Sequence, residues 1–156
     1  MTKQIIGASI GLDVSPDRPV PASLALLLKQ GETQIRQRLQ PLLDEFDLTL
    51  EHWRIMSVLH HAPGLRMTAL AEAAVVPAAT LTRHVDKLVE LGLVLRRVDP
   101  GDKRRVAAAL SPRGSELASQ LSGAEAAIET RVADGLGGER FEALLHDLAL
   151  LGHLLD

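Results

Sequence analysis

Hydrophobic side chains recur every three or four positions along most of the chain, which is the spacing that places them on one face of an α-helix. At the N-terminal side this pattern predicts a first helix from Ala22 to about Glu45. At the C-terminal side it predicts two long helices, one from residue 112 to about 134 and one that follows the glycines at 135–138. The first 21 residues contain three prolines and two glycines, so we expect an irregular N-terminal arm there.

Three shorter helices are predicted between these ends. Thr49 is a suitable N-cap for a second helix that ends near residue 63, and Thr68 is a suitable N-cap for a third that runs to residue 74. Pro77 fits the first turn of a fourth helix, because a proline there loses no hydrogen bond, and Gly92 ends that helix.

A pair of strands follows the fourth helix. Residues 93–98 and 106–110 flank the turn sequence Asp99-Pro100-Gly101-Asp102, although three consecutive alanines at 107–109 favour a strand only weakly. Ser111 and Pro112 then supply an N-cap and a first-turn proline for the next helix. The order predicts a mostly α (α+β) fold, a winged helix-turn-helix with helical extensions at both ends.

Composition narrows the class of protein. Hydrophobic residues make up 46% of the 156 residues, enough for a buried core, while aromatic residues make up only 2% and there are no cysteines. Disulfides, thiolate zinc sites and cysteine nucleophiles are therefore excluded. No apolar run approaches the ~20 residues of a membrane span and no signal segment opens the chain, so we expect a soluble cytoplasmic protein with no membrane partner.

Charge is concentrated in the middle of the chain. Residues 66–113 hold 9 Lys/Arg and 5 Asp/Glu, a net charge of +4, whereas residues 1–65 hold 6 and 7 and residues 114–156 hold 2 and 8, net −1 and −6. A basic segment between neutral and acidic ends suits a surface that meets nucleic acid phosphate. The alternative is chance clustering of solvated charge.

The candidate DNA-binding residues lie on the fourth helix and at the hairpin tip. Side chains near the start of a helix that enters the major groove reach base edges, and arginine pairs well with guanine. On the helix the candidates are Thr80, Thr82, Arg83 and His84, of which His84 fits phosphate contact and solvent exposure equally. At the tip we expect Arg104 to enter the minor groove or meet the backbone, Asp102 to orient an arginine, and Lys103 and Arg105 to bind phosphates. The alternative for both groups is an exposed surface without a partner.

These fragments, taken in order, resemble the MarR family of bacterial transcriptional regulators. The likeness runs from about Leu24 to Leu154. It implies a homodimer whose terminal helices form the interface, two winged-helix lobes, double-stranded operators with two-fold symmetry, and release of DNA by a small, often aromatic and anionic, effector. The residue after Arg104 is usually small in the family, whereas this chain has Arg105. The fragments that carry the resemblance are residues 48–54, 67–72, 80–83, 88–93, 99–104 and 110–114.

Other chemistry finds less support. Trp53 lies where family members pack the junction between the dimerisation region and the DNA-binding lobe. We therefore expect it to pack in the core, and the alternative is that it contacts the effector. His52 and Met56 are weaker candidates for effector contact.

Six histidines invite a metal site, but the adjacent His60 and His61 point to different faces of a helix. The pair His146 and His153 lie about 10 Å apart along a helix axis, so no metal site is predicted. No motif for a catalytic triad or a phosphate-binding glycine loop is present, and no cofactor or enzymatic activity is expected.

The sequence thus predicts a division into the arm at 1–21, a helical dimerisation region at 22–47 and 112–156, and a winged helix-turn-helix DNA-binding domain at 48–111. The predicted function is that of a ligand-responsive homodimeric repressor that binds a pseudo-palindromic operator. The alternative is a dimeric winged-helix module that binds proteins and has lost operator binding.

Overall fold

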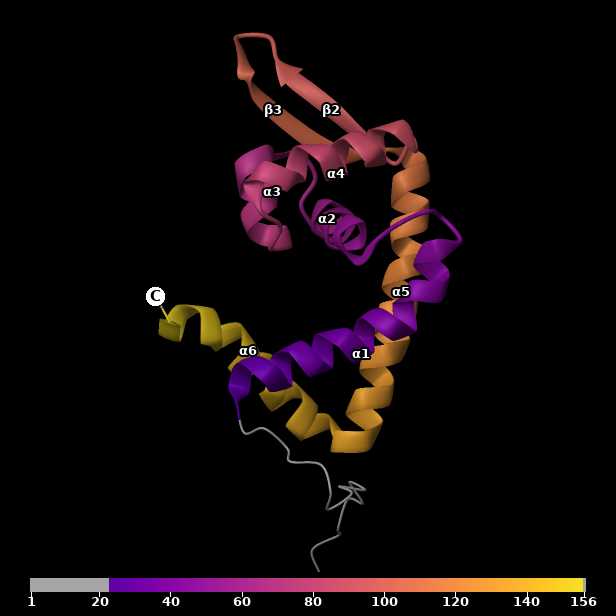
Figure 1. Ribbon diagram of the computed structural model, residues 1–156, viewed down its shortest axis with the longest axis vertical. Coiled ribbons are helices and arrows are strands. Elements are labelled where there is room, and N and C mark those ends of the chain that lie inside the picture. Colours follow the sequence, from indigo (N-terminus) through magenta and orange to yellow (C-terminus); the bar gives the residue numbers. More distant parts are fainter. Residues whose placement is uncertain (1–22, 156) are drawn as a thin grey trace, which may run out of the picture. The chain divides into compact units, whose positions relative to one another are not determined.

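The computed structural model describes residues 23–155, and Figure 1 shows their order. The irregular arm predicted for residues 1–21 lies outside the described residues. The elements of the described chain are α1 (Leu24–Asp44), α2 (Leu50–His61), β1 (Leu65–Arg66), α3 (Met67–Ala74), α4 (Ala78–Glu90), β2 (Val94–Asp99), β3 (Asp102–Leu110), α5 (Pro112–Leu136) and α6 (Gly138–Leu155). The predicted class, a mostly helical winged helix-turn-helix, is confirmed.

The chain divides after Thr33 into two compact units. Of the described residues, the first unit holds the beginning of α1, where the Lys29 ammonium lies 2.7 Å from the Glu32 carboxylate. The second unit begins at Gln34 and contains the rest of α1 and all later elements.

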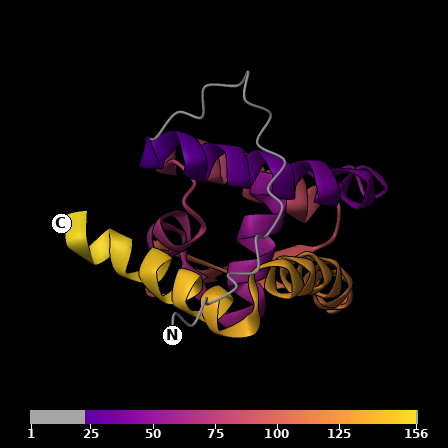
Figure 2. The same cartoon turned by 90° about the horizontal axis from the view of Figure 1, so that it is seen from below.

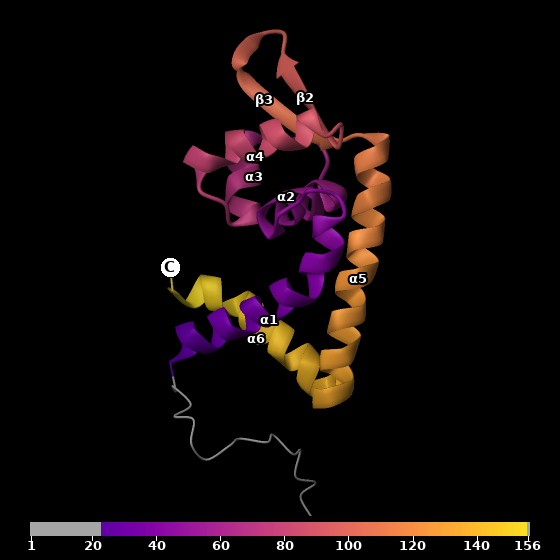
Figure 3. The ribbon, with the colours of Figure 1, turned by 45° about the vertical axis from the view of Figure 1, so that its right-hand side comes forward.

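The hydrophobic core of the second unit is almost entirely aliphatic. Its interior joins one face each of α2, α3 and α4 to the sheet and to the first half of α5, and in Figure 3 the hairpin of β2 and β3 projects beyond these helices. Trp53 is the largest buried side chain, with 2% of its surface exposed. The fully buried members include Leu39, Leu43, Ile55, Met56, Leu59, Leu70, Val85, Leu88 and Leu121.

A three-stranded antiparallel sheet of order β1-β3-β2 forms the wing. Two details differ from the prediction. The return strand begins at Asp102 and not at Val106, and β1 was not predicted because two residues are too short for a periodic pattern. β3 is the central strand, paired on both sides, so its ladder hydrogen bonds outweigh the poor strand preference of Ala107 and Ala108.

Helix starts confirm two predicted caps. The Thr49 hydroxyl accepts a hydrogen bond from the backbone N–H of His52 at 3.3 Å, and His52 Nδ1 accepts from the Thr49 N–H at 3.0 Å. The Ser111 hydroxyl accepts from the Gly114 N–H at 2.9 Å and Pro112 begins α5. Both are the predicted arrangements of an N-terminal cap.

Two other predicted starts are wrong by one or two residues. Arg66, not Thr68, is the N-cap of α3, because β1 runs directly into the helix and its pairing with β3 fixes where the chain turns. Pro77 is the N-cap of α4 and not part of its first turn, since its backbone is extended and its carbonyl accepts the first helical hydrogen bonds from Thr80 and Leu81.

The last two helices meet at a glycine turn. α5 ends at Leu136, two residues beyond the predicted end, and Gly137 turns the chain with a φ of 88° into α6. Figure 2 views α5 close to end-on and shows α6 leading away from its C-terminal end. Among the helices of residues 23–155, none combines the length and the apolar character that crossing a bilayer requires.

Candidate nucleic-acid interface

α4 presents a polar face at its N-terminal half. Leu81 and Val85 are buried on the opposite face, so the helical period turns Thr82 and Arg83 to the surface, where both are exposed. The Arg83 side chain has no hydrogen-bond or ion-pair partner among the described residues. Thr80 is half-buried and its hydroxyl donates to the Pro77 carbonyl at 3.1 Å, which leaves the lone pairs of its oxygen to accept.

Arg96 of β2 attaches the hairpin to this helix. Its guanidinium forms an ion pair with Asp86 of α4 and donates a hydrogen bond to the Thr82 carbonyl at 3.3 Å. The structure gives Arg96 a positioning role, because one guanidinium spans the helix and the strand that follows it.

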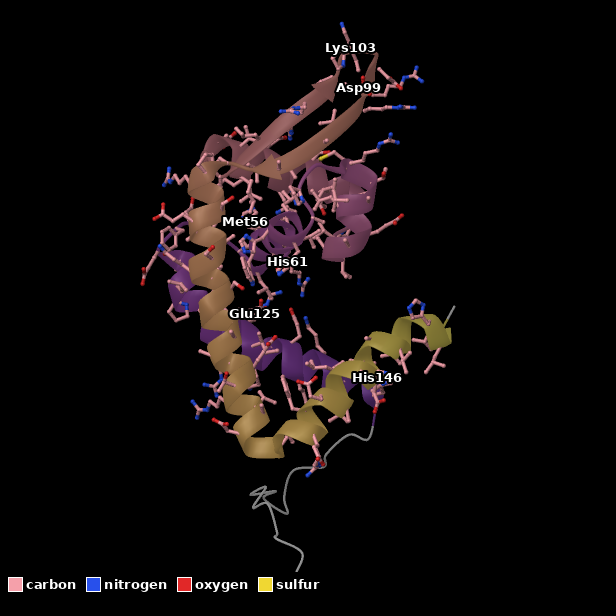
Figure 4. The ribbon with its side chains drawn as sticks, turned by 180° about the vertical axis from the view of Figure 1, so that it is seen from behind. Met56, His61, Asp99, Lys103, Glu125 and His146 are labelled. Atoms are coloured by element: carbon pink, nitrogen blue, oxygen red, sulfur yellow. The ribbon has the colours of Figure 1, made fainter. Side chains whose placement is uncertain are left out.

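At the hairpin tip, two cationic side chains have no partner among the described residues. Asp99 Oδ1 accepts from the Gly101 N–H at 2.8 Å, and Asp102 Oδ1 accepts from the Arg104 N–H at 3.0 Å. Asp102 Oδ2 lies 3.5 Å from Arg105 Nε, so the arginine side chain beside Asp102 is Arg105. The side chains of Lys103 and Arg104 are exposed and neither has a partner among the described residues. Figure 4 shows Lys103 and Asp99 at the far end of the hairpin.

The back of α4 is fixed to the start of α2. The Lys87 ammonium lies 2.6 Å from a carboxylate oxygen of Asp47, and this ion pair lowers the pKa of Asp47 and raises the pKa of Lys87. The His84 and His52 rings meet edge to face with their centroids 5.1 Å apart. Burial, and secondarily the nearby His84, lowers the pKa of His52. A ring that accepts the Thr49 N–H is therefore held neutral.

Comparisons with known proteins match the part of the chain that carries these candidate residues. A family model described as the MarR family matches residues 46–105, a range that includes every predicted DNA-binding and effector residue. The structure of the transcriptional regulator PA4135 is 28% identical with a TM-score of 0.76, and the match covers 87% of this chain and 98% of that one. The segment at 46–105 is therefore similar to the MarR family of regulators.

Two further structures of known proteins are similar to this chain. NadR in complex with 4-hydroxyphenylacetate is 27% identical with a TM-score of 0.75, and the match covers 87% of this chain and 96% of that one. The transcriptional repressor CouR bound to a 23-mer DNA duplex is 23% identical with a TM-score of 0.74, covering 83% of this chain and 92% of that one. The latter likeness is one of fold.

The residues predicted to contact an effector lie inside the second unit. His52, Trp53 and Met56 are exposed by only 6%, 2% and 0%. Trp53 forms a hydrogen bond with the side chain of Glu125 on α5. Figure 4 places Glu125 and His61 on the side of α2 away from the hairpin. Among residues 23–155, no three His, Cys, Asp or Glu side chains gather as a metal site would require.

Glu125 was missed by sequence reasoning although a signal was present. It lies four residues after Leu121 and eight after Leu117, both buried on α5, so a carboxylate occupies the apolar stripe of that helix. Burial raises the pKa of Glu125, and the Trp53 hydrogen bond opposes that effect. A titratable group set into an apolar stripe is a recognisable sign of a specific contact.

Proposed function

We propose that this chain is a homodimeric transcriptional regulator that binds a pseudo-palindromic site in double-stranded DNA. The observation that carries the proposal is the distribution of cations. Arg83 on the helix and Lys103 and Arg104 on the hairpin are exposed and have no protein partner among the described residues, whereas Arg96 and Lys87 are paired within the fold. The structure of CouR bound to duplex DNA, which shares this fold, supports the assignment.

Each exposed group has a proposed role. Thr80, Thr82 and Arg83 would read base edges from the major groove, with Arg83 suited to a bidentate pair with guanine. His84 is half-buried against His52, so its proposed contact is a backbone phosphate at the rim of the groove. On the wing, the proposed minor-groove contact is Arg104, which Asp102 holds through its backbone N–H.

Lys103 and Arg105 would bind phosphates beside the groove that Arg104 enters. Arg105 remains on the carboxylate of Asp102 at 3.5 Å, so its proposed contact uses the guanidinium nitrogens that face away from that carboxylate. Together these contacts fix the register of the wing on the backbone, while the base edges supply sequence preference.

The terminal regions are the proposed dimer interface, at residues 22–47 and 112–156, with residues 48–111 as the DNA-binding domain. α6 contributes no buried residue within the chain. A partner copy would cover its leucines, which leave a large apolar surface exposed. Two-fold symmetry would then place the two α4 helices about 34 Å apart in successive major grooves. The exposed leucines of α6 are Leu144, Leu145, Leu148, Leu150, Leu154 and Leu155.

We further propose that a small aromatic, anionic effector releases the protein from an operator that it occludes. Support comes from NadR, which was captured with 4-hydroxyphenylacetate. In this chain the residues proposed to contact the effector are His52, Trp53 and Met56. All three are buried, so an effector would have to open the packing around them. The proposed activity is binding and not catalysis.

Selection from a pool of random duplexes tests the proposal. The wild type is expected to enrich a motif with two-fold symmetry, and Arg83→Ala is expected to lose preference at one base pair per half-site at a cost of about 1–3 kcal/mol. Arg131→Ala removes the same charge at an exposed position of α5, outside residues 48–111. It serves as the charge-matched control once gel filtration has shown that it remains a dimer, and it should then enrich the wild-type motif. If no motif emerges while the protein remains a folded dimer, the protein-binding module becomes the better description.

A further inference from the structure

Three arginines surround one alanine on the sheet of the wing. Ala107 of β3 is paired with Arg66 of β1 on one side and with Arg97 of β2 on the other, and Arg105 precedes it by two residues on β3. Cross-strand partners share a face of a sheet, and so do alternate residues of a strand. All three guanidinium side chains therefore rise from the same face as the Ala107 methyl.

This face points away from α4. The neighbouring pair, Arg96 and Ala108, lies on the opposite face, where Arg96 bonds to Asp86 of α4 and Ala108 is 1% exposed. Because successive residues alternate between faces, Arg97 and Ala107 turn outward. The three arginines are thus separate from the surface that carries Arg83.

An open hollow of about 390 Å³ lies over Ala107. Its wall includes Arg66, Arg97, Arg105 and Asp99, so three positive charges face one negative charge. The Asp99 carboxylate already accepts the Gly101 N–H at 2.8 Å. The hollow therefore carries a net positive charge.

The arginines of this hollow are only partly satisfied by the protein. Arg105 Nε lies 3.5 Å from Asp102 Oδ2, and that pair leaves the outer nitrogens of the guanidinium available. Neither the Arg66 guanidinium nor the Arg97 guanidinium has a hydrogen-bond or ion-pair partner among residues 23–155. Two guanidinium groups that flank one small side chain across a rigid sheet are an arrangement that binds a planar or tetrahedral oxyanion by paired N–H donors.

We propose that Arg66, Arg97 and Arg105 form a phosphate site on the outer face of the wing. Arg66 and Arg97 stand two strand spacings apart, about 10 Å, so their long side chains converge over Ala107 from either side. The site rests on the proposed function in one respect. Its expected occupant is a backbone phosphate of DNA that flanks the operator half-site, beyond the contacts of α4, Lys103 and Arg104, and a free phosphate compound would use the same chemistry.

The proposed site explains why the central strand β3 has an alanine at position 107. A β-branched residue would suit the central strand better, but its bulk would fill the space between the two arginines. Ala107→Glu therefore tests the site while all three arginines remain, because a carboxylate between Arg66 and Arg97 would pair with both. Ala109→Glu adds the same charge to the same face two residues along β3, outside the lining of the hollow, and is the matched control.

The first arm of the test needs no DNA. The protein is titrated with pyrophosphate while the arginine Nε–H signals are followed by nuclear magnetic resonance. Arg66 and Arg97 are expected to shift together with one saturation curve, and Ala107→Glu should abolish both shifts while Ala109→Glu retains them. The exposed Arg131 of α5 reports on unspecific ionic effects and should not follow that curve.

The second arm compares a minimal selected duplex with one extended by about half a helical turn, roughly five base pairs, at each end. Extension should strengthen binding by the wild type and steepen its salt dependence. In Arg97→Ala that gain should disappear, with a slope smaller by about 1, which is about three- to fourfold in affinity between 50 and 200 mM salt. Arg97→Lys keeps the charge and should retain part of the gain, and Arg104→Ala should weaken both duplexes alike.

The outcomes separate the site from the proposed function. A gain on extension that requires Arg97 identifies DNA phosphate as the occupant. Pyrophosphate shifts that Ala107→Glu abolishes, without any length dependence, identify a free phosphate compound. Pyrophosphate binding by a protein that binds no duplex would leave the site intact and refute the DNA proposal. Independent or absent shifts of Arg66 and Arg97, together with equal affinities for both duplexes, would overturn the phosphate site.

Discussion

Val75, in the turn between α3 and α4, adopts the left-handed backbone conformation with φ 53° and ψ 47°. Side chains with a branched Cβ are disfavoured there, because Cβ approaches the following carbonyl oxygen. The conformation is imposed by the turn. The Val75 N–H reaches the carbonyl oxygens of Ala71 and Glu72, and the Val76 N–H bonds to Ala71 at 3.0 Å. Strain is therefore held at the entry to α4.

Replacing Val75 by glycine should stabilise the protein. The left-handed conformation costs an L-residue about 1–2 kcal/mol, and glycine loses about 0.5–1 kcal/mol of conformational entropy on folding. The Val75 side chain is 78% exposed, so little buried apolar surface is lost, and the hydrogen bonds of the turn use only backbone atoms. The net gain is about 0.5–1 kcal/mol, which corresponds to a rise in Tm of about 1–4 °C.

Thermal and urea unfolding of Val75→Gly, Val75→Asn and Val75→Ala would measure the effect. Asparagine tolerates the left-handed region, so its variant should gain stability as well. Alanine removes the branch but keeps Cβ, so its variant should fall between the wild type and glycine. If Val75→Gly instead lowered the free energy of unfolding by about 1 kcal/mol, and Val75→Ala were more stable than Val75→Gly, the assignment of strain to this turn would be refuted.

The remaining predictions concern the start of α5 and the start of α2. A Cβ added at Gly114 would lie 1.9 Å from the Leu93 carbonyl oxygen, so Gly114→Ala should destabilise the fold by about 3 kcal/mol in urea unfolding. Gly123 of the same helix has nothing within 4 Å of an added Cβ, and Gly123→Ala should instead stabilise by about 0.5–1 kcal/mol. The pKa of His52 is lowered in the folded state, so unfolding takes up a proton and stability should decline as pH falls below about 6.5. His52→Gln keeps an acceptor for the Thr49 N–H and should remove that part of the pH dependence, whereas an unchanged pH profile would show that His52 does not cause it.

The features predicted from the sequence are those encoded by local patterns. The caps at Thr49 and Ser111 each depend on a hydroxyl followed three residues later by its partner, which is visible within one helical turn. The period of the apolar side chains on α4 and the turn residues at the hairpin tip are equally local. Such signals predicted the winged helix-turn-helix and placed Thr82, Arg83 and Arg104 on it.

The features that were missed depend on partners distant in the chain. β1 exists because Leu65 and Arg66 pair with residues of β3 about 40 positions later, and this pairing moved the start of α3 away from Thr68. The ion pair of Arg96 with Asp86 and the hydrogen bond of Glu125 with Trp53 require the packed fold as well. Apolar periodicity indicates which face is buried but not which polar group meets which.

The most direct test of the central claim is the salt dependence of duplex binding, measured by fluorescence anisotropy on a selected duplex and on a shuffled sequence of equal length. The proposed operator binding predicts tight association with the selected duplex that weakens steeply with salt, and a smaller salt slope with weaker binding for Arg104→Ala on both sequences. Weak binding that is equal on both duplexes and unchanged in Arg104→Ala would contradict it.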